Sequence, residues 1–144
     1  MSDMKKFKLL VFIDDDHPTN IFHEITVNRS GVTEKSIFFL SPVDALNYFK
    51  DLSTKEDIQT PDVIFLDINM PQLTGWEFLE EYKKIEIEKS PVIIMLTTSL
   101  LDKDRKKAEG IDVVYKLINK PLNKTVLNEL NAELTTGEII SDDK

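Results

Sequence analysis

Residues 61–71 read PDVIFLDINMP, and this stretch decides the expected fold. The apolar run at 63–66 lies between two prolines, is too short for a helix and is typical of a strand buried on both faces. Such strands lie in the middle of parallel sheets, and ligands bind beyond their carboxyl ends. The run ends at Asp67, so this carboxylate is expected at a binding crevice. A simpler interpretation stays open, in which Asp67 only caps a turn before Pro71.

The rest of the chain alternates strand and helix patterns in the same way. The expected strands are 7–13, 36–40, 63–66, 92–96 and 113–118, and the expected helices are 18–30, 42–49, 75–85, 100–109 and 126–134. Five such pairs predict an α/β fold with a doubly wound, five-stranded parallel sheet and helices on both faces.

Local signals support several of the helices. Ser41 is a suitable N-cap, and Thr74 with Glu77 three residues later predicts a capping box. In the first helix, Ile21, Phe22 and Ile25 recur at helical spacing. The two histidines of the chain, His17 and His23, fall in this first helix and are both expected on its surface.

Composition sets limits on function. The chain has 144 residues with 41% hydrophobic content, the size of one domain, and no cysteine, which excludes disulfides and thiolate chemistry. The net charge of −8 argues against a nucleic-acid partner, and the apolar run at 9–13 is too short for a signal peptide or membrane span. We expect a cytoplasmic, stand-alone domain at 1–134 and a flexible C-terminal tail at 135–144.

Polar side chains of related chemistry follow four of the expected strands. Asp14 and Asp15 follow the first strand, Asp67 the third, Thr97 the fourth and Lys120 the fifth. Parallel strands about 5 Å apart present their carboxyl ends at one edge, so these groups are expected to share a pocket. Taken singly they could be a helix N-terminal acid cluster, a strand-end hydroxyl and a solvated lysine. Their joint placement favours a functional site.

The clustered acids predict a cation site. Two carboxylates about 4 Å apart repel by roughly 4 kcal/mol at an effective dielectric of about 20, and a divalent cation would remove that strain. All-oxygen ligands suit Mg²⁺ and also allow Mn²⁺. A carboxylate beside such a metal can act as the nucleophile of phosphoryl transfer. Mg²⁺ and Lys120 would then hold two phosphoryl oxygens, and the Thr97 hydroxyl would bond another.

These motifs resemble those of one family. Over residues 7–134 the chain is similar to the receiver domains of bacterial two-component response regulators, through the segments VFIDDD, PDVIFLDINMPQLTGWEFL, PVIIMLTTS and INKPL. The resemblance implies a flavodoxin-like receiver fold. It also implies a signalling protein rather than an enzyme, and this signalling protein would assist its own phosphorylation and dephosphorylation. Its implied partners are a histidine kinase or histidine phosphotransfer protein as donor and an unidentified downstream protein, with no membrane partner.

The resemblance also implies roles for particular residues. Asp67 is the implied phosphoacceptor, and Asp14 and Asp15 bind Mg²⁺ together with it. The backbone carbonyl of Asn69 completes the implied metal ligands. The family's switch hydroxyl and phosphoryl-binding lysine correspond to Thr97 and Lys120.

One position departs from the family's pattern. Receivers often carry an aromatic residue three positions before the lysine, whose rotation couples to the hydroxyl, and that position is Leu117. Tyr115 lies two residues earlier and is expected by strand alternation to face the same side. The sequence therefore keeps the phosphorylation site but lacks the usual aromatic switch.

Two functions from other classes use similar residues. A Mg²⁺-dependent phosphatase with an aspartate nucleophile shares the chemistry, but it normally pairs its acids two residues apart and needs a cap over the substrate. A receiver-like binding module that is never phosphorylated is the other alternative. Turnover of a small phosphate ester would identify the first, and absence of Mg²⁺ binding would favour the second.

Overall fold

The computed structural model describes residues 6–54, 59–99 and 101–136. Within them lies one parallel sheet of five strands in the order β2-β1-β3-β4-β5. The strands are β1 (Phe7–Ile13), β2 (Thr33–Phe39), β3 (Val63–Asp67), β4 (Val92–Thr97) and β5 (Val114–Asn119), and the helices are α1 (His17–Ser30), α2 (Pro42–Leu52), α3 (Gly75–Tyr82), α4 (Asp102–Glu109) and α5 (Lys124–Thr136). The predicted doubly wound α/β fold is confirmed.

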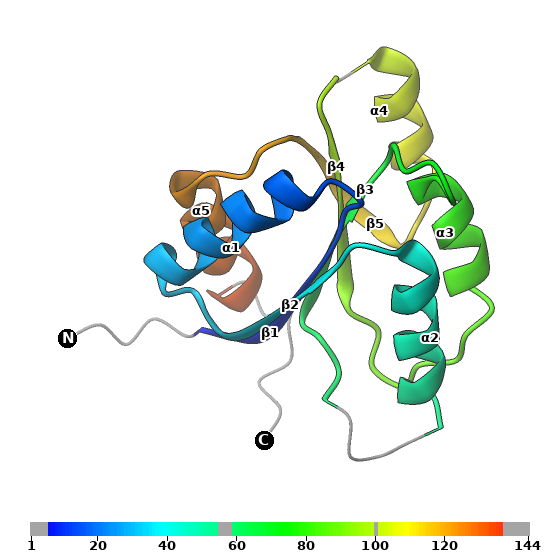
Figure 1. Ribbon diagram of the computed structural model, residues 1–144, viewed down its shortest axis with the longest axis horizontal. Helices are drawn as coiled ribbons and strands as arrows, with labels where there is room; N and C mark the ends of the chain where they lie inside the picture. Colours follow the sequence, from blue (N-terminus) through cyan, green and yellow to red (C-terminus); the bar gives the residue numbers. More distant parts are fainter. Residues whose placement is uncertain (1–5, 55–58, 100, 137–144) are drawn as a thin grey trace.

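Helices cover both faces of the sheet. Figure 1 shows α1 and α5 on one face and α2, α3 and α4 on the other. An apolar cluster fills each layer, and β3 contributes to both. Ile64 and Leu66 pack beneath α2 and α3, whereas Val63 and Phe65 pack beneath α1 and α5. The central strand is therefore buried on both faces, as its apolar run predicts.

The starts of α2 and α3 follow their sequence signals, whereas α2 ends three residues later and α3 three residues earlier than expected. Ser41 accepts a hydrogen bond from the backbone of Asp44, and Thr74 and Glu77 form the predicted capping box. Helix α5 continues through Thr136, two residues past the expected boundary, and the rest of the expected tail, 137–144, lies outside the described residues. Leu100, the expected start of the fourth helix, also lies outside them. None of the helices in the described part is long and apolar enough to cross a membrane.

Helix α1 turns an unexpected face toward the protein. Ile21, Phe22 and Ile25 are exposed, and the buried positions include Asn20 and His23. The expectation that both histidines lie on the surface is right for His17 and wrong for His23, which is 1% exposed. The physical reason is that Nε2 of the His23 imidazole accepts a hydrogen bond from the backbone amide of Leu122, which lies far away in the sequence.

Strand β5 contains an irregularity that changes which way its side chains face. Ile93 pairs with Val114 and Ile94 with Lys116, so Tyr115 is an extra residue in the strand. Tyr115 packs toward the cluster beneath α1 and α5, and Leu117 packs toward the opposite cluster. The expectation that these two side chains share a side is therefore wrong, because simple alternation does not hold across a bulge.

Candidate functional site

Two aspartates meet at the carboxyl ends of β1 and β3, which are neighbours in the sheet. Ile13 pairs with Leu66, so the next residues, Asp14 and Asp67, lie side by side. Their exposed fractions are 2% and 3%, whereas Asp15 is exposed. Each of the three offers a carboxylate oxygen, and these oxygens lie within 4.8 Å of one another. The strand ends thus bring together the acids that the sequence singled out.

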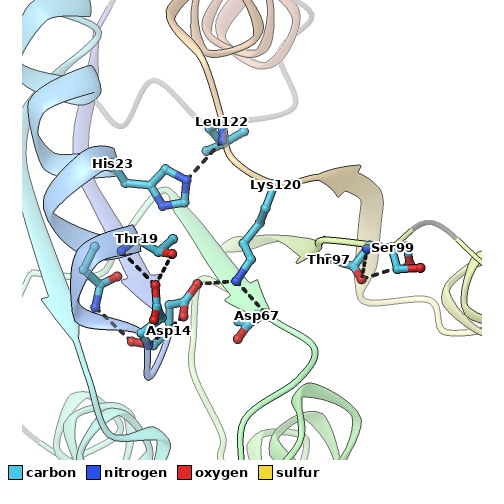
Figure 2. A network of polar contacts seen from close by, with 10 residues as sticks. Asp14, Thr19, His23, Asp67, Thr97, Ser99, Lys120 and Leu122 are labelled. Atoms are coloured by element: carbon cyan, nitrogen blue, oxygen red, sulfur yellow. Dashed lines mark hydrogen bonds and ion pairs between the residues drawn. The ribbon is translucent and has the colours of Figure 1, made fainter.

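Lys120 reaches this cluster from the loop after β5. Its Nζ lies 2.8 Å from Oδ2 of Asp14 and 3.1 Å from Oδ1 of Asp67, as Figure 2 shows. The backbone amide of Lys120 donates to the carbonyl of Thr97 at 2.7 Å, which ties the loop to the end of β4. The ammonium group therefore bridges the two buried carboxylates.

The electrostatics of the cluster are not balanced by this lysine alone. Burial and the charge of Asp14 raise the pKa of Asp67 to about 6, although Lys120 and the backbone amide of Asn69 lower it. Burial alone would lower the pKa of Lys120, but Asp14 and Asp67 outweigh it and raise that pKa. Ionised Asp67 is therefore disfavoured, and added positive charge at this place would stabilise it.

The donor set fits a hard divalent cation. Carboxylate oxygens that converge from the ends of β1 and β3 are the ligands that Mg²⁺ prefers, and the exposed Asp15 leaves one side open to water. Asn69 is also exposed and directly follows this edge of the sheet. Its backbone carbonyl stays a predicted ligand.

The hydroxyl of Thr97 is engaged within its own loop. Thr97 is buried at the end of β4, where its Oγ1 donates to the carbonyl of Ser99 and accepts from the amide of the same residue, both at 3.1 Å. Figure 2 shows this pair set apart from Asp14 and Lys120. Thr97 therefore belongs to the same edge of the sheet, but its hydroxyl is bonded away from the acids.

Helix α4 contacts the site through its neighbour α3. Nζ of Lys107 lies 4.9 Å from the centre of the Trp76 ring, at a distance that allows a cation–π contact. Both residues line a pocket of about 390 Å³ that also includes Asn69, Thr97 and Ser99. The pocket joins the acidic edge to the surface of α4.

Three residues that support the site were missed by sequence reasoning. Asn20 donates from Nδ2 to the carbonyl of Asp14 at 2.9 Å, and Nε2 of His23 accepts from the amide of Leu122. A Cβ on Gly75 would lie 2.6 Å from the backbone oxygen of Asp67. The available signals were the spacing of two polar residues three apart in the first helix and a glycine at the start of the helix after β3.

The fold and the aspartate cluster together define a receiver-type α/β protein. The sequence matches the response regulator receiver domain family over residues 11–131. The chain therefore belongs to the response regulator receiver family.

Individual relatives agree with this assignment. The probable methanogenesis regulatory protein FilR2 of Methanothrix harundinacea is 26% identical over 115 residues, which cover 80% of this chain and 73% of that protein. A two-component response regulator from Cytophaga hutchinsonii superimposes with a TM-score of 0.82 at 27% identity, covering 92% of this chain and 99% of that chain. A response regulator receiver protein from Dyadobacter fermentans gives 0.76 at 27% identity, with coverages of 89% and 98%.

Proposed function

We propose that the protein is the phosphoacceptor of a two-component or phosphorelay pathway, and that Asp67 receives the phosphoryl group. The donor would be a histidine kinase or a histidine phosphotransfer protein. The observation that carries the proposal is the convergence of Asp14, Asp15 and Asp67 with the ammonium of Lys120 across them. Such a set of charges stabilises the oxygens of a phosphoryl group during its transfer.

The chemistry follows from the state of the Asp67 carboxylate. With a pKa of about 6 it is mostly ionised at neutral pH and more basic than an ordinary aspartate. One of its oxygens attacks phosphorus, and the bond from phosphorus to the donor imidazole nitrogen breaks. The electron pair stays on that nitrogen, and because the other ring nitrogen of the phosphohistidine carries a proton, the donor leaves as neutral imidazole. The product is an aspartyl phosphate.

Two sets of groups would assist this transfer. Asp14, Asp15 and Asp67 would hold Mg²⁺, with the Asn69 carbonyl as a further ligand and Mn²⁺ as a substitute metal. The bound ion would neutralise charge on the phosphoryl oxygens. Lys120 already lies 3.1 Å from Asp67, so its ammonium can move with little displacement from carboxylate to phosphoryl oxygen.

The response to phosphorylation would use Thr97. A phosphoryl group adds up to about two negative charges and strong acceptors at Asp67. The Thr97 hydroxyl donates to Ser99 in the unmodified protein, so it would have to exchange that partner for a phosphoryl oxygen. The exchange would move the loop before α4 and change the surface offered to a downstream protein. With Leu117 at the aromatic position, this movement would proceed without a rotating ring.

The exposed face of α1 is suited to docking the donor. Ile21, Phe22 and Ile25 are each 45–47% exposed on the helix that follows Asp14. A pocket of about 250 Å³ lies between Phe22 and Pro121 and includes Lys120. Apolar surface next to a reactive group is typical of a protein contact site. The net charge of −8 favours protein over nucleic-acid partners in this pathway, which we take to be cytoplasmic.

The test is intact-protein mass after incubation with Mg²⁺ and acetyl phosphate. We expect the wild type to gain one phosphoryl group, and Asp67→Asn and metal-free protein to gain none. Asp44→Asn, an exposed aspartate near the start of α2, is the matched control and should react like the wild type. Folded wild type that binds Mg²⁺ but gains no mass with acetyl phosphate or with a panel of histidine kinases would contradict the proposal.

The phosphatase alternative is tested in the same samples. Release of phosphate from a small phosphate ester with many turnovers would favour an enzyme. Within the described residues, the five strands form one sheet and the five helices follow them in alternation, with no inserted cap segment among these elements.

A further inference from the structure

Helix α1 presents polar side chains to both loops of the site. Asn20 and His23 lie on its inner face and are 4% and 1% exposed. Asn20 bonds the carbonyl of Asp14, and His23 bonds the amide of Leu122, two residues after Lys120. One helix therefore contacts the backbone of two loops: residues 14–16, here called the acidic loop, and residues 120–122, here called the lysine loop.

The lysine loop is held on both sides of Lys120. On one side, the amide of Lys120 donates to the carbonyl of Thr97 at 2.7 Å. On the other side, the amide of Leu122 donates to Nε2 of His23 at 3.1 Å. Figure 2 shows the imidazole of His23 directly beside this turn of the chain. The path of residues 120–122 is thus fixed by one bond from the sheet and one from α1.

A purely structural role explains this histidine poorly. The ring packs against Phe12, with ring centres 5.4 Å apart, in a place where an aliphatic side chain would fit an apolar core. Among the residues that the structure describes, its Nδ1 has no hydrogen-bond partner, and an unpaired buried polar atom costs free energy. Burial lowers the pKa of His23 to about 4, so the ring is neutral and its Nε2 is free to accept.

We propose that His23 is a positioning residue for Lys120. By accepting the amide hydrogen of Leu122 it holds the loop so that the ammonium group lies between Asp14 and Asp67. The inference deepens the proposed function and rests on it, because the position of the ammonium matters for phosphoryl transfer. Misplacing a catalytic group by about 1 Å can cost about a hundredfold in rate, and supporting hydrogen bonds commonly account for tenfold or more.

The experiment measures the rate of phosphorylation by acetyl phosphate at saturating Mg²⁺ in four proteins. His23→Leu removes the acceptor and keeps an apolar side chain, whereas His23→Gln offers an oxygen at about the place of Nε2. Thr26→Val is the matched control, since Thr26 is a buried polar residue on the same face of α1 whose hydroxyl donates to the carbonyl of Phe22 within the helix. We expect a loss of about tenfold in His23→Leu, and rates within about twofold of wild type in the other two.

Two further readouts separate positioning from general damage. The dissociation constant for Mg²⁺ should stay within about twofold in His23→Leu, because the three carboxylates are not touched. In a Lys120→Met background His23→Leu should cause no further loss of rate, because it acts through the ammonium group. A further loss of about tenfold in that background would show a structural effect instead.

The outcomes distinguish a failure of the proposed function from a failure of the role proposed for His23. Wild type that is never phosphorylated would overturn the proposed function and this inference with it. Wild type that reacts while folded His23→Leu reacts equally fast would overturn the inference alone. Equal losses in His23→Leu and His23→Gln would also overturn it, because the acceptor atom would then not be what matters.

Discussion

The two sides of the aspartate cluster are held in different ways. On the α1 side, Asn20 and His23 bond the backbone of the loops that carry Asp14 and Lys120. On the α4 side, Thr97 bonds within its own loop. Of the α4 residues, all of which the structure describes, Ala108 alone is buried, and seven of the eight are charged.

Under the proposed function, this difference gives the two sides different tasks. Buried hydrogen bonds keep the acidic side and the lysine in one arrangement, as positioning of reactive groups requires. A helix with little buried apolar surface can change its position at low cost, as a switching element requires. The comparison predicts large effects of substitutions on the α1 side and small effects on stability on the α4 side.

The largest effect is expected from Lys120→Met. Removing the ammonium leaves two buried carboxylates without their partner, and breaking a buried ion pair costs about 3–5 kcal/mol. Denaturant unfolding without metal measures this loss, and Mg²⁺ should restore part of it. Lys116→Met is the control, because the ion pair of Lys116 with Glu133 is exposed and should contribute less than about 1 kcal/mol. Equal losses of stability in Lys120→Met and Lys116→Met would contradict the stabilising role of the buried ion pairs of Lys120.

A second prediction concerns pH. Without metal, Asp67→Asn should raise the free energy of unfolding by about 3 kcal/mol at pH of about 7.5, because the folded protein raises the pKa of Asp67 from 3.8 to about 6. The gain should be complete above the folded pKa of about 6. This gain in stability should shrink as the pH falls toward 3.8, because Asp67 of the folded wild type then binds a proton and no longer carries its unfavourable buried charge. Unfolding curves across this range measure it.

His23 should make the free energy of unfolding depend on pH in the opposite direction. Its pKa is lowered from 6.5 to about 4, so the unfolded chain binds a proton first as the pH falls. Its contribution to stability is present above pH 6.5 and is lost down to about pH 4. In the wild type the two slopes oppose each other, and in Asp67→Asn the loss due to His23 should stand alone. A flat profile in Asp67→Asn between these pH values would contradict the assignment.

Gly75→Ala should have an intermediate effect. The added Cβ would lie 2.6 Å from the backbone oxygen of Asp67, and backbone at this place cannot yield as a flexible side chain would. Overpacking of this kind costs about 2 kcal/mol. Gly110→Ala is the control, because its Cβ would meet nothing closer than 3.6 Å and its φ of −86° suits alanine. Thermal unfolding of both variants measures the difference.

The smallest effect on stability is expected from Leu117→Tyr. Leu117 lines a pocket of about 240 Å³ between α4 and β5, so a larger ring has space, and the change should stay below about 1 kcal/mol. If the α4 side is the moving side, the ring should alter hydrogen exchange in α4 on phosphorylation while the phosphorylation rate stays within about threefold. A large loss of stability would show that the α4 side is tightly packed and would contradict the difference between the two sides.

The sequence was sufficient for the fold and for the convergence of the acids. Strand β1 matches its predicted range because a continuous apolar run between charged segments has few alternatives. Asp14, Asp67 and Lys120 could be placed together because parallel strands end at one edge, and a strand end is visible in the sequence.

The sequence was not sufficient for contacts that depend on distant partners. The inward face of α1 depends on the amide of Leu122, which lies 99 residues from His23. The bulge at Tyr115 depends on how β5 pairs with β4, and no local pattern encodes that register. The bonding of Thr97 depends on the conformation of its loop. Each of these features is set by tertiary structure rather than by local propensity.

The contact between Lys107 and Trp76 makes the protein its own optical probe. Trp76 is the single tryptophan of the chain, so its fluorescence comes from one known place, and a nearby ammonium group shifts the energy of an excited indole. Movement of α4 away from α3 would remove that charge and change the emission. If metal binding and phosphorylation move α4 as the proposed function requires, the emission of Trp76 in the unlabelled wild type would follow both events in one continuous signal.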